Sequence, residues 1–425
     1  MDIISKKTAF IAGAVLSSAI AIAGEAPKYD TDTLTGDWGG NRTSLYQQGL
    51  AFDIGYKSDI LRVTEGGQSQ GGRPMYHLDV KLKADLEKLW GLESTTALLN
   101  VIDDRGDQLN ASHVYSQLGV SNIEVATKTY RLLNAWVQKE WEDGRWSLLG
   151  GMYPIDSEFM AVESAGVFLQ PPYGTLGDLS PTHTPSIFNT STLGVRAKWL
   201  SSDRNFYGQW AITNGISGDP DHPRGTHVRF GYGAMSIAEV GYHPTEPTHP
   251  AVGAVDHAEP KANEPAENFE KYAFGLWGYS ADDRLADPIN DKRRWGWYTQ
   301  AEKTIAQGTV LGDLSVFLRY SRSYGNASSI ENATNTGLRL RGLLPGRDND
   351  IAGIAYTRAR LSEWFRADQI NNGIATAETE QAWEVTYHIQ VTPWFAVQPD
   401  WQRIVKPGGN TPSATIAGFR VELTF

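Results

Sequence analysis

The chain has 425 residues, 40% of them hydrophobic and 11% aromatic, with a net charge of −11 and no cysteine. The acidic balance gives no electrostatic attraction to nucleic acid, and a chain of this length can build its core without disulfides. Beyond residue 23 no run approaches the roughly 18 apolar residues of a membrane helix, so the mature protein is expected to be either soluble or a β-barrel, whose alternating strands are polar on average.

The N-terminus has the features of an export signal. Two lysines precede an apolar run at residues 9–23 that ends in a small-x-small cleavage site. The run is too short and too rich in alanine and serine for a stable spanning helix, so it predicts a secretory signal peptide at residues 1–23. Residues 24–49 are then an N-terminal periplasmic segment, with a short helix predicted at Arg42–Gln48 and ended by Gly49.

Residues 50–425 show the period-two alternation of β-strands and are expected to form one transmembrane barrel. In Met75–Glu87, six apolar side chains face one way and six polar side chains face the other. A soluble core sheet seldom needs six polar groups in a row on one face, whereas the wall of a water-filled lumen does. The candidate strands are Leu50–Val63, Met75–Glu87, Ser94–Asp103, Tyr130–Trp141, Trp146–Tyr153, Thr192–Leu200, Asn205–Thr213, Arg229–Gly241, Lys271–Ser280, Arg294–Thr304, Gly312–Arg322, Gly337–Leu344, Ile351–Leu361, Thr379–Val391, Phe395–Val405 and Ala414–Phe425.

The links between these strands alternate in length, as they do in bacterial outer-membrane barrels, where an even strand count puts both ends on the periplasmic side. Long links such as 104–129 and 154–191 alternate with short ones such as 142–145. Residues 242–270 fall where a short turn is due and are rich in proline, glutamate, alanine and histidine. We interpret them as a periplasmic insertion; a missed strand, the alternative, would break the even count. Five tryptophans border predicted periplasmic links, as an aromatic belt would: Trp90, Trp141, Trp146, Trp199 and Trp394.

The last strand separates an apolar face from a charged one. Phe419, Val421 and Phe425 lie on one face, and Arg420 and Glu422 on the other. A strand of this pattern that ends on an aromatic residue resembles the closing strand of bacterial outer-membrane barrels, an ending that the barrel-assembly machinery reads. An edge strand of a soluble sheet is the alternative. The sequence therefore predicts an all-β transmembrane antiparallel barrel of about 16 strands, with a short N-terminal helix, in the outer membrane of a Gram-negative bacterium.

Several blocks of the chain are similar to the carbohydrate-selective outer-membrane porins of the OprB family. They are Gly36–Gly40 with Arg42 and Leu45, Gly342–Asp350, and Glu384–Trp394, which continues into Val397–Asp400 and Pro407–Gly409. The resemblance implies a sixteen-stranded barrel that passes monosaccharides or related polyols down their gradient. The insertion after Tyr242 departs from this pattern. A porin for an organic acid or aromatic solute, or a secreted β-rich carbohydrate-binding protein or glycosidase, are the other interpretations that we consider.

The lumen-facing parity of three successive strands predicts a basic patch of five residues. These are Arg319, Arg339, Arg341, Arg358 and Arg360. Acidic and amide groups on the closing and opening strands are expected opposite them, among them Glu384, Asp400, Asp53 and Asp79. Walls of opposite charge suit neutral polyhydroxy solutes, because their hydroxyl groups both donate and accept hydrogen bonds. The alternative is that any aqueous lumen collects mixed charges.

The long link at residues 154–191 is expected to fold into the lumen, as a loop of sixteen-stranded porins commonly does. It carries aromatic rings beside carboxylates, notably Asp156, Glu158 and Phe159. Sugars are bound by that combination, with rings against their C–H faces and charged groups at their hydroxyls. Packing of the loop on the outer mouth is the alternative for each of these residues.

Catalysis and cofactors are not expected, because the sequence has no nucleotide-binding loop, paired metal-ligand motif or nucleophile elbow. The expected partners are small carbohydrates, outer-membrane lipid and, through Phe425, the barrel-assembly machinery; a homo-oligomer remains open.

Overall fold

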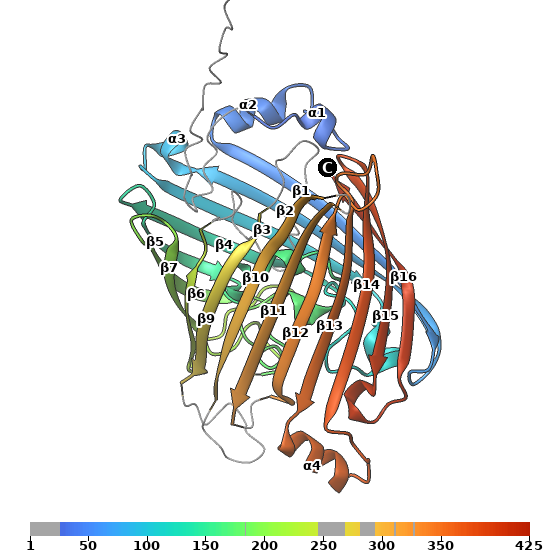
Figure 1. Ribbon diagram of the computed structural model, residues 1–425. Coiled ribbons are helices and arrows are strands. Elements are labelled where there is room, and N and C mark those ends of the chain that lie inside the picture. The colour runs from blue at the N-terminus through green and yellow to red at the C-terminus, as the bar shows by residue number, and fades with distance from the viewer. Residues whose placement is uncertain (1–25, 183, 245–267, 281–293, 310–311, 326–327) are drawn as a thin grey trace, which may run out of the picture.

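The computed structural model describes residues 26–182, 184–244, 268–280, 294–309, 312–325 and 328–425. These residues form sixteen antiparallel strands in a closed barrel, in which each strand pairs with its neighbour in sequence and β1 pairs with β16 (Figure 1). The predicted fold class is thereby confirmed. The strands are β1 (Leu50–Glu65), β2 (Gly71–Asp85), β3 (Thr95–Gly106), β4 (Thr129–Trp141), β5 (Trp146–Tyr153), β6 (Thr192–Leu200), β7 (Phe206–Asn214), β8 (Ala234–Tyr242), β9 (Glu270–Tyr279), β10 (Trp295–Thr309), β11 (Gly312–Tyr324), β12 (Ile330–Arg341), β13 (Ile351–Leu361), β14 (Thr379–Thr392), β15 (Phe395–Val405) and β16 (Ala414–Thr424).

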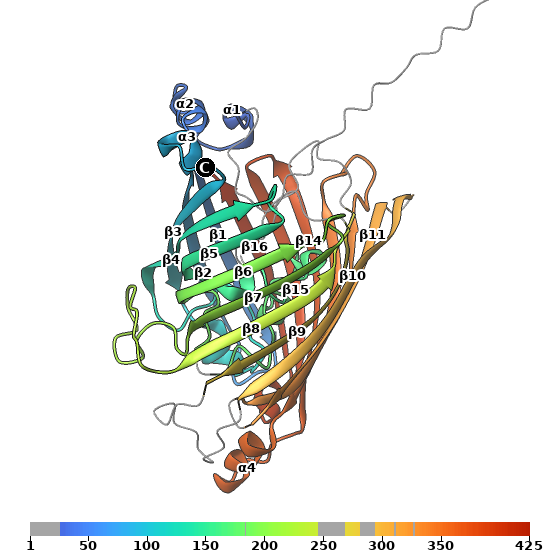
Figure 2. The same cartoon turned by 90° about the vertical axis from the view of Figure 1, so that its left-hand side faces the viewer.

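The two ends of the barrel differ in what covers them. Three short helices, α1 (Tyr29–Asp32), α2 (Asn41–Gln47) and α3 (Leu86–Trp90), lie at the end that also holds the C-terminus, and α4 (Glu363–Asn371) lies at the other (Figures 1 and 2). Because the short turns fall at the first end and the long loops at the second, we assign the first as periplasmic and the second as extracellular. None of the helices in the described part of the chain is long and apolar enough to cross a membrane.

Most of the insertion predicted between Tyr242 and Glu270 lies outside the described residues. Its flanking strands, however, pair with each other directly, from Met235 opposite Tyr279 to Tyr242 opposite Tyr272. No strand is therefore missing between β8 and β9, and the link joins their periplasmic ends. The predicted signal peptide likewise lies outside the described residues and stays a prediction.

Some strand limits differ from the prediction for local reasons. β2 ends at Asp85 rather than Glu87, because the Asp85 carboxylate accepts hydrogen bonds from the amides of Glu87 and Lys88, each at 3.1 Å, and so begins α3. β12 begins at Ile330, seven residues before the predicted start at Gly337. Its first half carries asparagine and threonine side chains, which are common in loops, and for that reason the sequence did not indicate a strand there. The predicted helix at Arg42–Gln48 is present as α2, one residue earlier.

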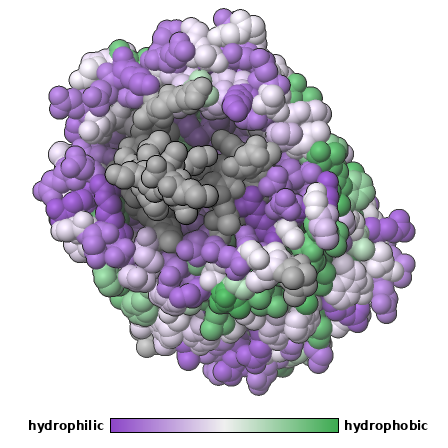
Figure 3. All heavy atoms as spheres, turned by 45° about the horizontal axis from the view of Figure 1, so that its top comes forward, coloured by the Kyte–Doolittle hydropathy of each residue, from purple (hydrophilic) through white to green (hydrophobic). Residues whose placement is uncertain are grey.

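The outer surface is apolar between two aromatic belts. Val385 is 43% exposed and Phe419 is 38% exposed, whereas their neighbours Glu384 and Arg420 are fully buried on the lumen side. The rings of Trp146 and Trp199 lie 6.3 Å apart at the periplasmic end. Figure 3 shows hydrophilic residues around the periplasmic mouth and hydrophobic ones on the barrel's side. The alternation predicted for β16 is confirmed.

Arg42 joins the N-terminal segment to both strands of the barrel seam. Its side chain lies between the rings of Tyr29 and Trp38, at 4.1 and 4.8 Å from their centroids. It donates hydrogen bonds to the main-chain oxygens of Phe425, at 2.9 Å, and of Phe52 in β1, at 2.8 Å. Arg42, which the sequence marked as the start of a helix and as part of a family block, therefore fastens the first strand to the end of the last.

Candidate functional site in the lumen

Two extracellular links fold back into the barrel and narrow its lumen. We refer to residues 107–128, between β3 and β4, as the first inward loop, and to residues 154–191, between β5 and β6, as the second; residue 183 of the second is not described. Hydrogen bonds from both loops reach wall residues more than 100 positions away in sequence. The inward fold of the second loop is as predicted, whereas that of the first was not foreseen.

Three lumen-facing glutamates of the wall hold the second inward loop by its main chain. Glu384 of β14 accepts from the amides of Leu169, at 2.5 Å, and Gln170, at 3.0 Å. Glu302 of β10 accepts in the same way from Ser164, at 2.7 Å. A third, on β8, accepts from one loop amide and from two tyrosine hydroxyls of the wall. Carboxylates that accept amide hydrogens make strong, charge-assisted bonds, so the loop is held at several points.

Arg319 of β11 holds the same loop by donating to its carbonyl oxygens, whereas the glutamates accept from its amides. Its guanidinium is 1% exposed and donates to the main-chain oxygens of Met160, at 2.7 Å, Thr175, at 2.9 Å, and Pro172. The lumen-facing orientation predicted for Arg319 is correct, but its donors are engaged by the loop. In this position the guanidinium shapes the lumen by fixing the loop.

Glu158 forms a buried ion pair with a wall arginine that the sequence did not single out. Arg196 of β6 donates to its two carboxylate oxygens at 2.6 and 2.7 Å, and the Tyr153 hydroxyl donates at 2.6 Å. Burial alone would raise the pKa of Glu158, but the charge and hydrogen bonds of Arg196 outweigh it and leave the pKa lowered. Glu158 is therefore an ionised anchor of the loop.

The other two loop residues predicted to face solute lie in the loop's interior. Phe159 is fully buried in an apolar cluster with residues of the wall. Asp156 is 3% exposed and accepts from the amide of Phe188 at 3.0 Å. Burial raises the pKa of Asp156 to about 7, and does the same for Asp178, whose carboxylate accepts from the hydroxyl of Ser321. The contacts of these residues with sugar stay a prediction.

The first inward loop is held by groups of the closing strands. Glu380 of β14 accepts from the amides of Gln117, at 3.0 Å, and Leu118, at 3.2 Å. In the adjacent seam, Arg420 and Asp59 form a fully buried ion pair at 2.6 Å. That pair also bonds the side chains of Ser121 and Asn122 in this loop. The lumen faces of these strands carry further charges, such as Lys57 beside Asp59 and Glu384 beside Glu380, so the sequence had no local signal that singled out these anchors.

Arg358 and Arg360 do not face the lumen, so this part of the predicted basic patch is wrong. Both lie on the outer face of β13, whose lumen face consists of small or apolar residues such as Gly353 and Ala355. The second inward loop accounts for these small residues. Phe168 of the loop packs against the lumen face of β13 so closely that a Cβ on Gly353 would lie 2.7 Å from its ring. The lumen face of β13 is therefore matched to a packed ring, and the charges are on the other side.

The remaining predicted residues do face the lumen. Arg339 and Arg341 are 5% and 6% exposed; the guanidinium of Arg339 lies 5.0 Å from the ring centroid of Phe269, and Arg341 bonds Asn349 at 3.1 Å near the periplasmic turn. Asp400 of β15 is 4% exposed and accepts from a neighbouring glutamine of the same strand. Whether these three contact solute stays a prediction.

The wall formed by β1, β2 and β16 carries charges in opposite-sign pairs. Asp53 and Lys83 lie 2.5 Å apart, and Asp79 and Lys81 lie 3.2 Å apart. Lys57 lies 3.5 Å from a glutamate of β16. The side chains of Asp53, Lys83 and Asp79 are 52%, 24% and 15% exposed. This charged wall offers donors and acceptors side by side with little net charge, an arrangement that hydrogen-bonds hydroxyl groups without selecting an ion.

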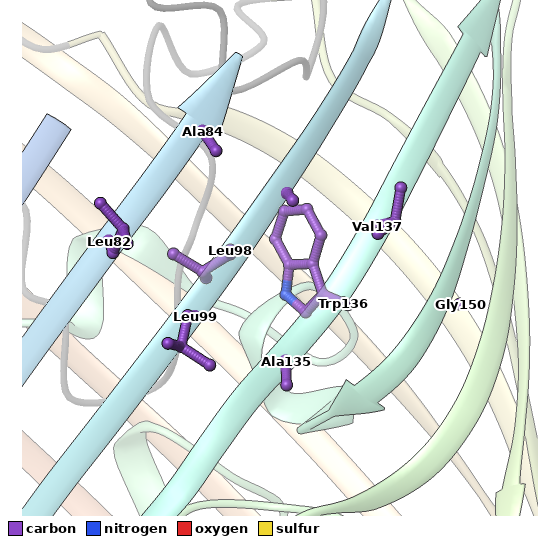
Figure 4. A pocket seen from close by; sticks show the side chains of 9 residues that line it. Leu82, Ala84, Leu98, Leu99, Ala135, Trp136, Val137 and Gly150 are labelled. Carbon is purple, nitrogen blue, oxygen red and sulfur yellow. The ribbon is translucent and has the colours of Figure 1, made fainter. Parts of the chain in front are cut away.

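A separate concavity lies in the wall of β2–β5 and is apolar (Figure 4). It forms where small side chains stand in a row on adjacent strands, among them Ala84, Ala97, Ala135 and Gly150. Most of its lining faces outward, and it holds few polar groups, so it does not suit a sugar. Within the described residues no group of three or more histidine, aspartate or glutamate side chains could hold a metal ion.

The chain matches a family model described as "Carbohydrate-selective porin, OprB family" over residues 69–425. It is 23% identical to Porin B of Pseudomonas aeruginosa, over 98% of this chain and 96% of that protein. It is 22% identical to the putative porin QuiX of Acinetobacter baylyi, over 99% of both chains. Among solved structures, the high-pH structure of Pseudomonas putida OprB matches with a TM-score of 0.77 and 19% identity, covering 94% of this chain and all of that one.

Proposed function

Because the chain belongs to the OprB family of carbohydrate-selective porins, we propose that it is a passive outer-membrane channel for monosaccharides and similar small polyols, without catalytic activity. Two inward loops clamped to the wall support this proposal, because a fixed constriction excludes large solutes. The solutes move down their own gradient, so that selectivity consists of size exclusion plus weak binding that lets a solute leave as well as enter.

We place the sugar path between the two inward loops and the charged wall of β1, β2 and β16. The second loop is bonded to β6, β8, β10, β11 and β14, and both loops meet the extracellular halves of β1 and β2, at Asp59 and His77. The periplasmic halves of β1 and β2 are therefore the part of this wall that these anchors leave uncovered. The pairs Asp53–Lys83 and Asp79–Lys81 present both signs there, and each pair can exchange hydrogen bonds with successive hydroxyls of a moving sugar. Arg339, Arg341 and Asp400 are further candidates on the lumen face.

Swelling of liposomes that contain the purified protein tests this function. Glucose should enter markedly faster than a disaccharide, an organic acid or an aromatic acid of similar size. Faster entry of the organic or aromatic acid would instead support a porin for that class of solute. Replacing one pair at once, as Asp79→Asn with Lys81→Gln, should weaken the block of single-channel current by glucose while the protein still inserts.

We further propose one partner, the barrel-assembly machinery, and a periplasmic location for the N-terminal segment. Phe425 follows β16 on the apolar face, which fits its reading by the barrel-assembly machinery. The N-terminal segment at residues 24–49 would then be periplasmic once the signal at 1–23 is removed. Deletion of Phe425 should lower the amount of inserted barrel, and insertion at the normal level would reject this role.

A further inference from the structure

Three arginines and a glutamate gather on the outer face of the barrel, at the extracellular ends of three adjacent strands. They are Arg322 of β11, Glu331 of β12, and Arg358 and Arg360 of β13, which we call the outer arginine cluster. The register sets them side by side, since Arg322 is opposite Asn332 and Asn332 is opposite Arg360. Their sequence neighbours on these strands, such as Ser321 and Thr357, are buried on the lumen side, so the arginines point outward.

The cluster lies within the extracellular aromatic belt, since Tyr320 and Tyr324 flank Arg322 on the outer face of β11 and its guanidinium lies 5.1 Å from the ring centroid of Tyr324. Tyr356 precedes Arg358 by two residues on the same face, and its ring packs at 4.7 Å, tilted by 45°, against that of Trp383 in β14. Tyr320 precedes Arg322 in the same way and packs against Trp297 at 5.4 Å. Two residues of a strand span about 7 Å. Because belts of tyrosine and tryptophan lie at headgroup level, the guanidinium groups fall at the depth of the outer leaflet's headgroups.

The charges of the cluster are only partly neutralised within the protein. Glu331 lies 2.9 Å from Arg322 and 3.7 Å from Arg360. Arg358 is exposed, and among the described residues it has no ion-pair or hydrogen-bond partner. Three arginines and one glutamate leave a net charge of +2. A guanidinium on a membrane-facing surface is costly unless an anion accompanies it, so this surface is suited to one.

We propose that the outer arginine cluster binds a phosphate group of a phosphorylated glycolipid in the outer leaflet, the kind of lipid represented by bisphosphorylated lipid A. Planar guanidinium groups bind phosphate through two parallel N–H donors, which a lysine cannot do. Arg358 and Arg360 stand on one face of one strand and can bind the same phosphate. Glu331 orients Arg322 and Arg360 toward it. The acyl chains of the same lipid would lie against the apolar surface below the belt.

Native mass spectrometry of the full-length mature barrel, released from detergent with defined lipid, tests the proposal. The double variant Arg358→Gln, Arg360→Gln is compared with Lys303→Gln, a control on the outer face of β10. Lys303 is ion-paired with Glu270 at 2.9 Å and lies at the periplasmic end. Heat-modifiable gel mobility reports whether each variant is folded. The probes are bisphosphorylated lipid A, enzymatically dephosphorylated lipid A, and inorganic phosphate as a competitor.

The wild-type barrel and the Lys303→Gln control should retain bisphosphorylated lipid A with equal affinity, and the double variant should bind it about tenfold more weakly or worse. Dephosphorylated lipid A should bind the wild type as weakly as lipid A binds the double variant, a comparison that needs no variant to fold. Equal binding of the two lipids would overturn the proposal. So would full competition by millimolar inorganic phosphate, which would mean a free-phosphate site, or protection of the cluster in a lipid-free oligomer, which would mean an interface between copies.

Discussion

The substitution Arg319→Met tests whether Arg319 anchors the second inward loop or contacts the solute. The wild-type guanidinium is 1% exposed and donates three hydrogen bonds to main-chain oxygens of that loop. A hydrogen bond from a charged donor contributes about 1.5–3 kcal/mol, so the three sum to at least about 4.5 kcal/mol. Because about 1.4 kcal/mol is a factor of ten, the docked loop should lose on the order of 1,000-fold of its advantage over the undocked one.

The glutamates that hold the loop's amides are untouched in this variant, so the loop should fluctuate rather than leave the lumen. Single-channel recording should then show a noisier current with a higher mean conductance, and liposome swelling should show faster entry of disaccharides. Arg347→Met is the control, since Arg347 also donates to a main-chain oxygen, that of Gln390, but lies at the periplasmic turn away from the loop. If Arg319→Met recorded as quietly as this control and still excluded disaccharides, the reasoning on loop anchoring would be refuted.

Three further outcomes are expected. The pKa of Asp156 and of Asp178, about 7, lies above the ordinary 3.8 because of burial; their contribution to loop docking is therefore complete below about pH 4 and is lost as pH rises through 7. Current noise should accordingly increase from pH 5 to pH 8, and Asp178→Asn should reduce this dependence on pH. If the variant kept the wild-type dependence, ionisation of Asp178 would not control loop docking. Val385→Arg puts a charge on the lipid face at a cost of about 2–4 kcal/mol near mid-membrane, so the folded band on a heat-modifiability gel should shrink relative to Val385→Leu, and equal bands would contradict the assigned sidedness. Arg42→Ala removes charge-assisted bonds to both seam strands and should lower the temperature at which that folded band disappears, by more than Asn41→Ala does.

The barrel could be predicted because the bilayer imposes its periodicity directly on the sequence. Every second residue of β16 faces lipid, so Phe419 and Val421 alternate with Arg420 and Glu422, and the same rule gave the strands and the sidedness of the turns. The alternation rule does not apply where a strand face packs against protein rather than lipid or water. In β13 the lumen face packs against Phe168 and is apolar, so the rule wrongly assigned the charged, outward-facing residues of this strand to the lumen.

The residues of the second inward loop exposed a different limit. Asp156, Glu158 and Phe159 have the composition of a sugar site, yet a folded loop needs its own anchors and apolar core, and these residues supply them. Composition does not distinguish the two uses. The distinction depends on long-range partners, such as Arg196 for Glu158, which no local pattern in the sequence specifies.

Arg42 is synthesised early, but one of its two hydrogen bonds across the seam can form only when the barrel closes. Its two acceptors lie 10 and 383 positions away, so one contact is local and the other spans nearly the whole chain. The second bond can form only after β16 has paired with β1. The second bond of Arg42, a residue made near the beginning, therefore forms in the last event of assembly. Arg42 and Tyr29 are buried in the closed barrel, and an unfinished barrel would leave them more accessible, a chemical difference by which complete and incomplete barrels could be told apart.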